Sequence, residues 1–273
     1  MADQKGRFVW YELMASDTEA AKAFYTKVVG WGTQDGPVPG MAYTMFTTGQ
    51  MPVGGMMAQP EDARKMGAPP SWIGYVAVDD VDATAERIKR LGGAVHVPPT
   101  DIPNVGRFSV VADPQSAVFA LFNSPNTCDA PLPEPGTPGH VGWHELSAAD
   151  WQKAFAFYSE LFGWQKAEAM DMGAMGTYQI FSVGGQPVGG MMNKPPIVPV
   201  PNWLYYINVA DIDAAIDRVK TGGGQILNGP MQVPGRSLDA VTSESGVRGG
   251  GVRNPPAASW ALSSASRRPR RWG

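Results

Sequence analysis

The sequence predicts an α+β protein made of two homologous halves, each built from two strand-and-helix modules. Three observations support this fold class. Four blocks of the first half return in the same order in the second half, apolar residues alternate in short β-rich runs, and helical segments begin at Asp or Ser and end at Gly. At 273 residues the chain is long enough for two domains of about 130 residues, each with its own core.

The repeat decides the architecture. Each block returns after 131 to 135 residues, and the offset changes only by the length of a loop. Chance does not explain four blocks in one order, so the halves derive from a duplication. The blocks are WYELMASD (10–17) and WHELSAAD (143–150), FYTKVVGW (24–31) and FYSELFGW (157–164), MPVGGMM (51–57) and QPVGGMM (186–192), and WIGYVAVDDVDATAERIKRLGG (72–93) and WLYYINVADIDAAIDRVKTGGG (203–224).

The elements of the first half follow in order from local patterns. FVWYELM alternates and predicts a strand, after which Ser16 or Asp17 caps a helix that runs to about Val29 and ends at a left-handed Gly30. AYTMFTTG and MPVGGMMA predict a hairpin, WIGYVAVDD a strand, DATAERIKRLGG a helix, and VGRFSVVADPQSAVFALFN two closing strands around a turn. Each half therefore contains two similar modules, and the chain is a duplication of a duplication.

The repeat also sets the predicted boundaries. We assign residues 1–124 to a first domain, 125–138 to a proline-rich linker, 139–236 to a second domain and 237–273 to a basic tail. The linker holds Cys128, and a single cysteine cannot form an internal disulfide, so we expect an exposed thiol in a reducing compartment.

The tail departs from the repeat after MQVPGRS (231–237). Ser, Arg, Gly and Pro dominate there, with no DP turn and no aromatic closing strand. We therefore expect the second domain to lack its closing strands, the tail to be disordered or the product of a reading-frame shift, and the exposed sheet edge to allow a homodimer. Residues 236–273 hold seven Arg, no Lys and two acids, so a basic arm for nucleic acid or an anionic surface is the competing interpretation.

Several classes of protein lack support in the sequence. No run of 18 apolar residues occurs and the start MADQKGRF has no signal-peptide core, so we expect a cytoplasmic protein that does not enter a membrane. No GxGxxG after a strand, GKS/T loop, GxSxG elbow or CxxC is found, which leaves nucleotide, hydrolase and thiol-redox functions without a motif.

These stretches resemble the vicinal oxygen chelate superfamily, which includes glyoxalase I, extradiol dioxygenases, and bleomycin- and fosfomycin-resistance proteins. The resemblance covers about residues 7–235, with FYTKVVGW and ADPQSAVFALF its most specific stretches, and the tandem arrangement is similar to bacterial two-domain glyoxalase-like proteins. It implies paired βαβββ modules that form cupped sheets, in which the enzymes hold one divalent metal through His, Gln or Glu side chains.

The metal-ligand positions that the resemblance implies fall on side chains without a suitable donor. Zinc, iron and nickel sites need three or four N, O or S donors, and indole and aliphatic groups supply none. We therefore expect no metal and no cofactor, and assign no catalytic residue. The positions are Trp10, Trp143, Ile73, Leu204, Ala120 and the strand VGGMM.

The resemblance implies that the candidate ligand-binding residues lie on the strand faces turned toward the cup. Alternation places Trp10, Glu12 and Met14 on one face, and Trp143 and Glu145 on the equivalent one. Each glutamate either accepts hydrogen bonds that lock the sheet or contacts a ligand, because a buried carboxylate needs a partner. Further lining is expected from Met56, Tyr75, Met191 and Tyr206.

The histidines offer a weaker alternative. His140 and His144 have the spacing of a helical metal pair, but on a strand both point away from Glu145. We expect them, and His96, to take part in surface or interlayer packing.

The function predicted from these residues is a metal-free protein that binds or sequesters an apolar or aromatic small molecule in a Trp- and Met-lined cup. One alternative is a metal-dependent lyase or dioxygenase of the glyoxalase type, with ligands other than those matched. The second is binding of nucleic acid or an anionic surface through the arginine-rich tail. Whether a reaction is catalysed is left open at this point.

Overall fold

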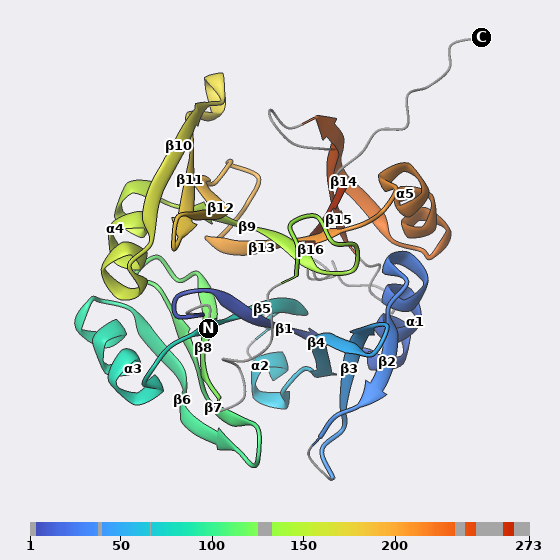
Figure 1. Ribbon diagram of the computed structural model, residues 1–273, viewed down its shortest axis with the longest axis horizontal. Coiled ribbons are helices and arrows are strands. Elements are labelled where there is room, and N and C mark those ends of the chain that lie inside the picture. The colour runs from blue at the N-terminus through green and yellow to red at the C-terminus, as the bar shows by residue number, and fades with distance from the viewer. Residues whose placement is uncertain are drawn as a thin grey trace. The chain divides into compact units, whose positions relative to one another are not determined.

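The computed structural model describes residues 4–37, 40–65, 67–124, 133–232, 238–243 and 259–264. Within these residues the chain forms two eight-stranded sheets, five α-helices and one short 3-10 turn, which confirms the α+β class (Figure 1). Cys128 and residues 125–132 of the predicted linker lie outside the described residues.

The described part of the first half contains eleven elements. They are β1 (Phe8–Ala15), α1 (Thr18–Val29), β2 (Gly32–Asp35), β3 (Tyr43–Thr48), β4 (Met51–Ala58), α2 (Glu61–Lys65), β5 (Ser71–Ala77), α3 (Val81–Arg90), β6 (Ala94–Ile102), β7 (Gly106–Ala112) and the closing strand β8 (Val118–Asn123). The second half contains β9 (Val141–Ala148), α4 (Trp151–Phe162), β10 (Gln165–Asp171), η1 (Gly173–Met175), β11 (Thr177–Val183), β12 (Gln186–Asn193), β13 (Asn202–Asn208), α5 (Ile212–Thr221), β14 (Gln225–Gln232), β15 (Leu238–Ser243) and β16 (Ser259–Ser264).

The strand orders of the two sheets repeat each other. The first sheet runs β2-β3-β4-β1-β5-β8-β7-β6 and the second runs β10-β11-β12-β9-β13-β16-β15-β14. Inside each sheet the order of the first four strands is mirrored by the next four, and the pairs β1–β4, β5–β8, β9–β12 and β13–β16 are parallel. The duplication inside each half is therefore confirmed in the topology.

The helix boundaries follow the predicted capping signals. Asp17, rather than Ser16, caps α1 by accepting a hydrogen bond from the backbone N–H of Ala20 at 2.9 Å. Gly30 ends the helix with φ of 87°, a left-handed conformation that costs a glycine little. Asp150 and Gly163 repeat this arrangement around α4.

The closing strands of the second half are present, which corrects the expectation that they are missing. β13 pairs with β16 through Tyr206 and Ala261, in the same register in which β5 pairs with β8 through Tyr75 and Ala120. The strand SWALSS thus takes the position of VFALFN, and Trp260 stands where Phe119 stands in the first half.

The repeat of the closing strands was not detected in the sequence because the offset between the halves changes at this point. Trp260 and Phe119 are 141 residues apart, whereas the other blocks are 131 to 135 apart, because the segment between β15 and β16 is longer than the turn between β7 and β8. Residues 244–258 and 265–273 lie outside the described residues, and with them most of the arginines on which the basic-arm interpretation depends. We predicted a homodimer because the second sheet was expected to have an exposed edge. β15 and β16 cover that edge, so this reason no longer holds, and the homodimer stays a prediction.

The chain forms two compact units, and each unit combines parts of both halves. Unit 1 comprises Met1–Tyr11, Ile73–Leu132 and Trp143–Leu204, and unit 2 comprises Glu12–Trp72, Pro133–Gly142 and Tyr205–Gly273. The predicted boundaries at residues 124 and 138 separate the two halves of the sequence repeat. That each half folds independently as a domain stays a prediction.

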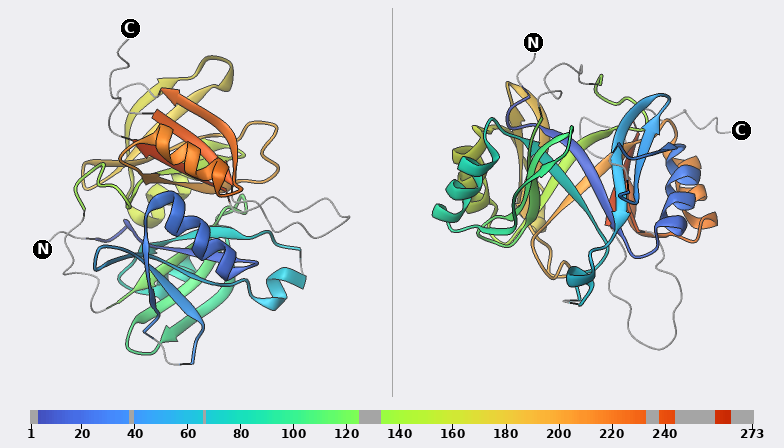
Figure 2. Two further views of the ribbon diagram at one scale, coloured as in Figure 1. Left: turned by 90° about the vertical axis from the view of Figure 1, so that its right-hand side faces the viewer. Right: turned by 90° about the horizontal axis from the view of Figure 1, so that it is seen from below.

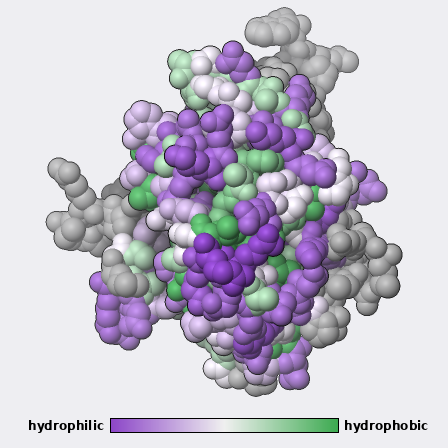
Figure 3. Space-filling model, turned by 90° about the vertical axis from the view of Figure 1, so that its left-hand side faces the viewer, coloured by the Kyte–Doolittle hydropathy of each residue, from purple (hydrophilic) through white to green (hydrophobic). Residues whose placement is uncertain are grey.

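In unit 1, α3 packs beside α4 (Figure 1), and aromatic side chains fill the core. Trp164 stacks on Phe181 with ring centroids 4.3 Å apart and donates from Nε1 to the carbonyl oxygen of Gly6 at 2.7 Å. Trp203 donates to the Tyr158 hydroxyl at 3.1 Å. On the face that carries α3 and α4, hydrophilic side chains cover much of the surface (Figure 3), among them Arg87, which pairs with Glu160 at 3.5 Å.

In unit 2, α1 and α5 lie side by side (Figure 2). The aromatic arrangement of unit 1 recurs there. Trp31 donates to the carbonyl oxygen of Gly139 at 2.8 Å, and Trp72 donates to the Tyr25 hydroxyl at 2.9 Å. These residues match Trp164, Trp203 and Tyr158 of unit 1 in the repeat. Tryptophan recurs at these positions because each indole both fills the core and satisfies a backbone or hydroxyl acceptor.

Of the described helices, none has the length and apolar character needed to span a bilayer.

Candidate functional site

On the strand face predicted for the site, hydrogen bonds connect the side chains of Trp143, Tyr178 and Glu145. Trp143 Nε1 donates to the Tyr178 hydroxyl at 2.7 Å, and that hydroxyl donates to Glu145 Oε2 at 3.1 Å. Trp143 is buried and Glu145 half-buried. The hydroxyl thus connects two side chains of β9 that alternation had predicted to share a face, and it fixes the orientation of the carboxylate.

Gly190 makes room for this arrangement. β12 pairs Gly190 with Glu145, and a Cβ on Gly190 would overlap the Tyr178 ring. A residue with a side chain would therefore push the ring away from Glu145. Close packing of a tyrosine ring thus explains the second glycine of this VGGMM strand, whereas a Cβ on Gly189 would overlap the Phe181 ring and the His144 carbonyl oxygen.

The first half is built in the same way. β4 pairs Gly55 with Glu12, and a Cβ on Gly55 would overlap the Tyr43 hydroxyl. Glu12 is only 7% exposed. Tyr43 and Tyr178 were missed from the sequence, although YTMF and YQIF return at an offset of 135 and could have identified them.

Two of the predicted lining residues are corrected. Met56 pairs with Leu13, and Met191 pairs with Leu146, so both lie on the opposite face of the sheet from Glu12 and Glu145. Their side chains are 1% and 0% exposed and fill the core. The methionine that follows each of them has the face predicted for the site: Met57 pairs with Met14, and Met192 pairs with Ser147.

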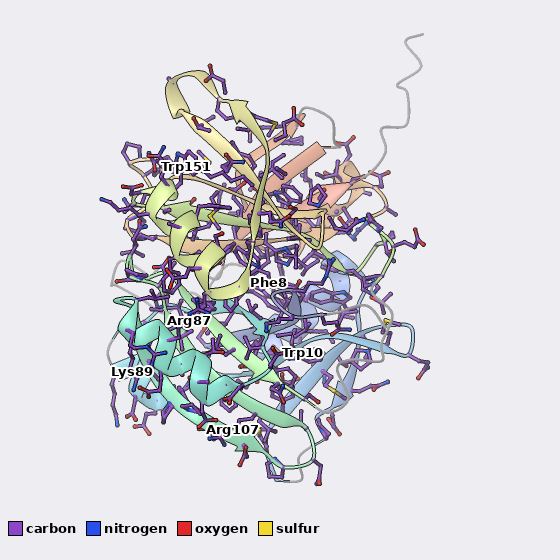
Figure 4. The ribbon with its side chains drawn as sticks, turned by 60° about the vertical axis from the view of Figure 1, so that its left-hand side comes forward. Phe8, Trp10, Arg87, Lys89, Arg107 and Trp151 are labelled. Carbon is purple, nitrogen blue, oxygen red and sulfur yellow. The ribbon has the colours of Figure 1, made fainter. Side chains whose placement is uncertain are left out.

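The other predicted residues lie on their expected strands. Trp10 and Met14 are half-buried on β1, where Figure 4 labels Trp10. Tyr75 pairs with Ala120, and its ring lies 6.3 Å from Phe108 and 6.2 Å from Phe122. Tyr206 is 6% exposed beside Ala261.

His144 lies in the packed interior of unit 1. Its ring stacks on Phe8 at 4.3 Å, its Nδ1 is 2.6 Å from the carbonyl oxygen of Val188, and its Nε2 is 2.7 Å from the Tyr11 hydroxyl. Because a carbonyl oxygen can only accept, Nδ1 carries the proton and Nε2 accepts from Tyr11. Burial lowers the pKa of His144 to about 4, although the bond to Val188 raises it, so the ring is neutral at pH 7.

The remaining histidines are less buried than His144. His140 lies near the carbonyl oxygen of Pro138 at 3.3 Å, and His96 is exposed on β6. Tyr11 and His144 occupy matching positions of the repeat and bond to each other, which the sequence did not reveal.

The residues at the family's ligand positions do not fit a divalent metal. The nitrogen of Trp143 donates a hydrogen bond to Tyr178, and Ile73, Ala120 and Leu204 are buried aliphatic side chains. In the described part of the chain, no three His, Cys, Asp or Glu side chains are grouped as metal ligands. Each glutamate would have to be joined by donors that these positions lack.

We expect Tyr178→Phe to lower the free energy of unfolding by about 1 to 3 kcal/mol, because it removes the acceptor of a buried indole N–H and the donor to Glu145. Urea unfolding of the variant and the wild type measures the difference. Met175→Ala, at a side chain 54% exposed, serves as the neutral control. Equal stability of the Tyr178 variant and the wild type would show that the hydroxyl bonds contribute nothing.

Comparison with known proteins agrees with this fold. The model of the Glyoxalase/Bleomycin resistance protein/Dioxygenase superfamily matches residues 7–121 and 137–248. CFP32 of Mycobacterium tuberculosis, provisionally named a glyoxylase, is 37% identical over 238 residues, covering 86% of this chain and 89% of CFP32. The anthracycline biosynthesis protein DnrV of Streptomyces peucetius is 32% identical over 250 residues, with the same coverage of 86% and 89%.

Solved structures share the fold at low identity. The Mn(II)-bound glyoxalase from Novosphingobium aromaticivorans has a TM-score of 0.59 and 17% identity, covering 96% of this chain and 82% of that one. The 2,2',3-trihydroxybiphenyl 1,2-dioxygenase of Sphingomonas wittichii has a TM-score of 0.63 and 13% identity, covering 97% and 91%. With both halves matched by the family model and two relatives aligned over most of their length, the chain belongs to the glyoxalase/bleomycin resistance protein/dioxygenase superfamily.

Proposed function

We propose that this protein binds an apolar or aromatic small molecule without a resident metal, on the strand faces that carry Glu12 and Glu145. One observation carries the proposal. Where the family's enzymes place metal donors, this chain has indole and aliphatic side chains, and the Trp143 N–H is already bonded to Tyr178.

The chemistry of these faces supports an aromatic ligand. In unit 1, Tyr75, Phe108 and Phe122 form a cluster of rings on one strand face. On β9, Glu145 is oriented by the Tyr178 hydroxyl, and a carboxylate can accept hydrogen bonds from several donors, including one on a ligand. An apolar surface with one oriented polar group is typical of small-molecule sites. Relatives named as anthracycline biosynthesis proteins also connect this family branch with small molecules.

The second candidate is a metal-dependent lyase or dioxygenase of the glyoxalase type. It is favoured by the name of CFP32, at 37% identity, and not by the donor set of this chain. Binding of nucleic acid through the arginines of the tail rests on residues outside those described, and no structural observation favours it.

Metal analysis and ligand screening separate the two candidates. The protein is purified without chelators, its metal content is measured, and its melting temperature is recorded with Zn, Ni, Mn and Fe salts and with aromatic small molecules, 1-naphthol first. We expect far less than one metal ion per chain, no response to the metals, and a rise in melting temperature with an aromatic compound, since a ligand at 100 times its Kd stabilises by about 2.7 kcal/mol.

Variants connect the response to the site. Glu145→Gln and Trp143→Phe should reduce the shift caused by the aromatic compound, and Ile197→Ala, at a side chain 89% exposed, should not. One equivalent of Zn, Ni, Mn or Fe per chain that is lost on replacing Glu12 or Glu145 would overturn the proposal and establish the metal-dependent candidate.

A further inference from the structure

A hollow in unit 2 opens at the N-terminal end of α1, on the helix side of the sheet and away from Glu12. It measures about 270 Å³ and lies against the outer strands β2, β3 and β4. Met41, Ala42 and Ala58 supply its apolar surface, and Lys22 and Asp35 also line it. Its size suits one small ring system rather than a large ligand.

The charged groups around the hollow are unused. Glu19, Lys22 and Asp35 all line it, and in the part of the chain that the structure describes their side chains have no hydrogen bond or ion pair. Together they carry a net charge of −1 at neutral pH. The hollow therefore favours a ligand with a positive charge.

The equivalent position in the second half is occupied by aromatic side chains. By the repeat, Trp151 matches Thr18 and Phe155 matches Lys22, so two aromatic rings of α4 replace two smaller or flexible side chains of α1. Figure 4 shows Trp151 at the start of α4. The helix side of the second repeat is thus filled by rings of its own chain.

A cation accompanies these rings. Lys166 Nζ lies 5.2 Å from the ring centroids of both Trp151 and Phe155, a cation–π arrangement. Strand register places Lys166 opposite Phe181 and Thr33 opposite Phe46, so Lys166 corresponds to Thr33. The second half therefore supplies rings and an ammonium from its own side chains, whereas the first half has a hollow lined by Thr18, by the two carboxylates and by Lys22.

We propose that the hollow at α1 is a binding site for a small aromatic amine. The ring of the ligand takes the position over Thr18 that Trp151 occupies in the second half, and its ammonium pairs with Glu19 and Asp35. This site is separate from the strand face of the proposed function, and neither depends on the other.

Tryptamine is the probe, titrated into the full-length protein and followed by backbone amide chemical shifts. We expect a Kd on the order of 1 mM, as for a ring buried in a half-open site, with shifts centred on Thr18, Thr44 and Lys22. Indole-3-propionate, of similar size and opposite charge, should bind at least several-fold more weakly. Glu19→Gln and Asp35→Asn should each weaken tryptamine binding by about two- to fivefold, and Glu86→Gln on α3 should leave it unchanged.

A second pair of variants tests the position of the ring. Thr18→Trp with Lys22→Phe copies the second half and should abolish the tryptamine shifts, and Thr44→Gln, which copies Gln179, should weaken binding from the sheet side. Retained affinity in both of these folded variants, or equal affinity for tryptamine and indole-3-propionate, would refute the site. Neither result bears on binding at Glu12 or Glu145, so the two proposals fail separately.

Discussion

Replacing Trp260 with alanine is expected to lower the free energy of unfolding by about 3 to 5 kcal/mol, the usual range for deleting a buried tryptophan. The side chain has no exposed surface, and its ring lies 5.3 Å from that of Tyr25 and 6.2 Å from that of Phe24. The loss is large because β16 supplies part of the core of unit 2 and not merely an edge. Urea unfolding followed by circular dichroism measures it.

Matched variants make this result interpretable. Phe119→Ala removes the equivalent ring of the first half, which is also 0% exposed, and should cost a similar amount. Ile197→Ala should change stability by less than about 0.5 kcal/mol. If Trp260→Ala behaves like Ile197→Ala, then β16 is not part of the folded core, and a tail produced by a reading-frame shift becomes the better account of residues 237–273.

The second large effect is a pH dependence that arises from His144. Its pKa in the folded protein is lowered from 6.5 to about 4 by burial. Between these two pH values the unfolded chain binds a proton that the folded protein does not, so stability falls as pH falls. The contribution is fully present above pH 6.5, is lost progressively down to about pH 4, and amounts to roughly 3 kcal/mol.

A double variant isolates this contribution. Tyr11→Phe combined with His144→Phe removes the titrating ring together with the hydroxyl that bonds to it. Acidic side chains also titrate below pH 5, but they do so in both proteins, so the difference in unfolding free energy between wild type and variant reports His144. The unfolding free energy of the wild type minus that of the variant should fall by roughly 3 kcal/mol from pH 7 to pH 4. A difference that does not change with pH would mean that the ring is not held neutral in the interior.

The capped helices show why much of the fold could be predicted locally. Asp17 and Gly30 act within a single helix, so the residues that start and stop α1 are neighbours in the chain. Alternation on β1 and β9 likewise placed Trp143 beside Glu145 on one face, because side-chain direction on a strand depends only on position. β2 and α2 were not predicted from local patterns, since short or exposed elements carry weak apolar periodicity.

The errors involve pairing between strands. Met56 and Met191 were assigned to the site because methionine suits a pocket, but the register of β4 against β1 and of β12 against β9 turns them to the core. A shift of one residue reverses the face of every side chain, and the sequence of one strand does not contain its register against another. Tyr178 was missed for the same reason, because its contact with Glu145 is made across β12.

The duplication and the α+β class could be inferred from the residues alone, because both depend on residue identity and order along the chain. The residues that the family resemblance places at the metal-ligand positions could be read in the same way. The contact between Tyr178 and Glu145, the bond between Tyr11 and its repeat equivalent His144, and the mixing of both halves in each compact unit emerged with the folded structure. These are long-range contacts, and their partners are selected by which surfaces bury one another when the whole chain packs.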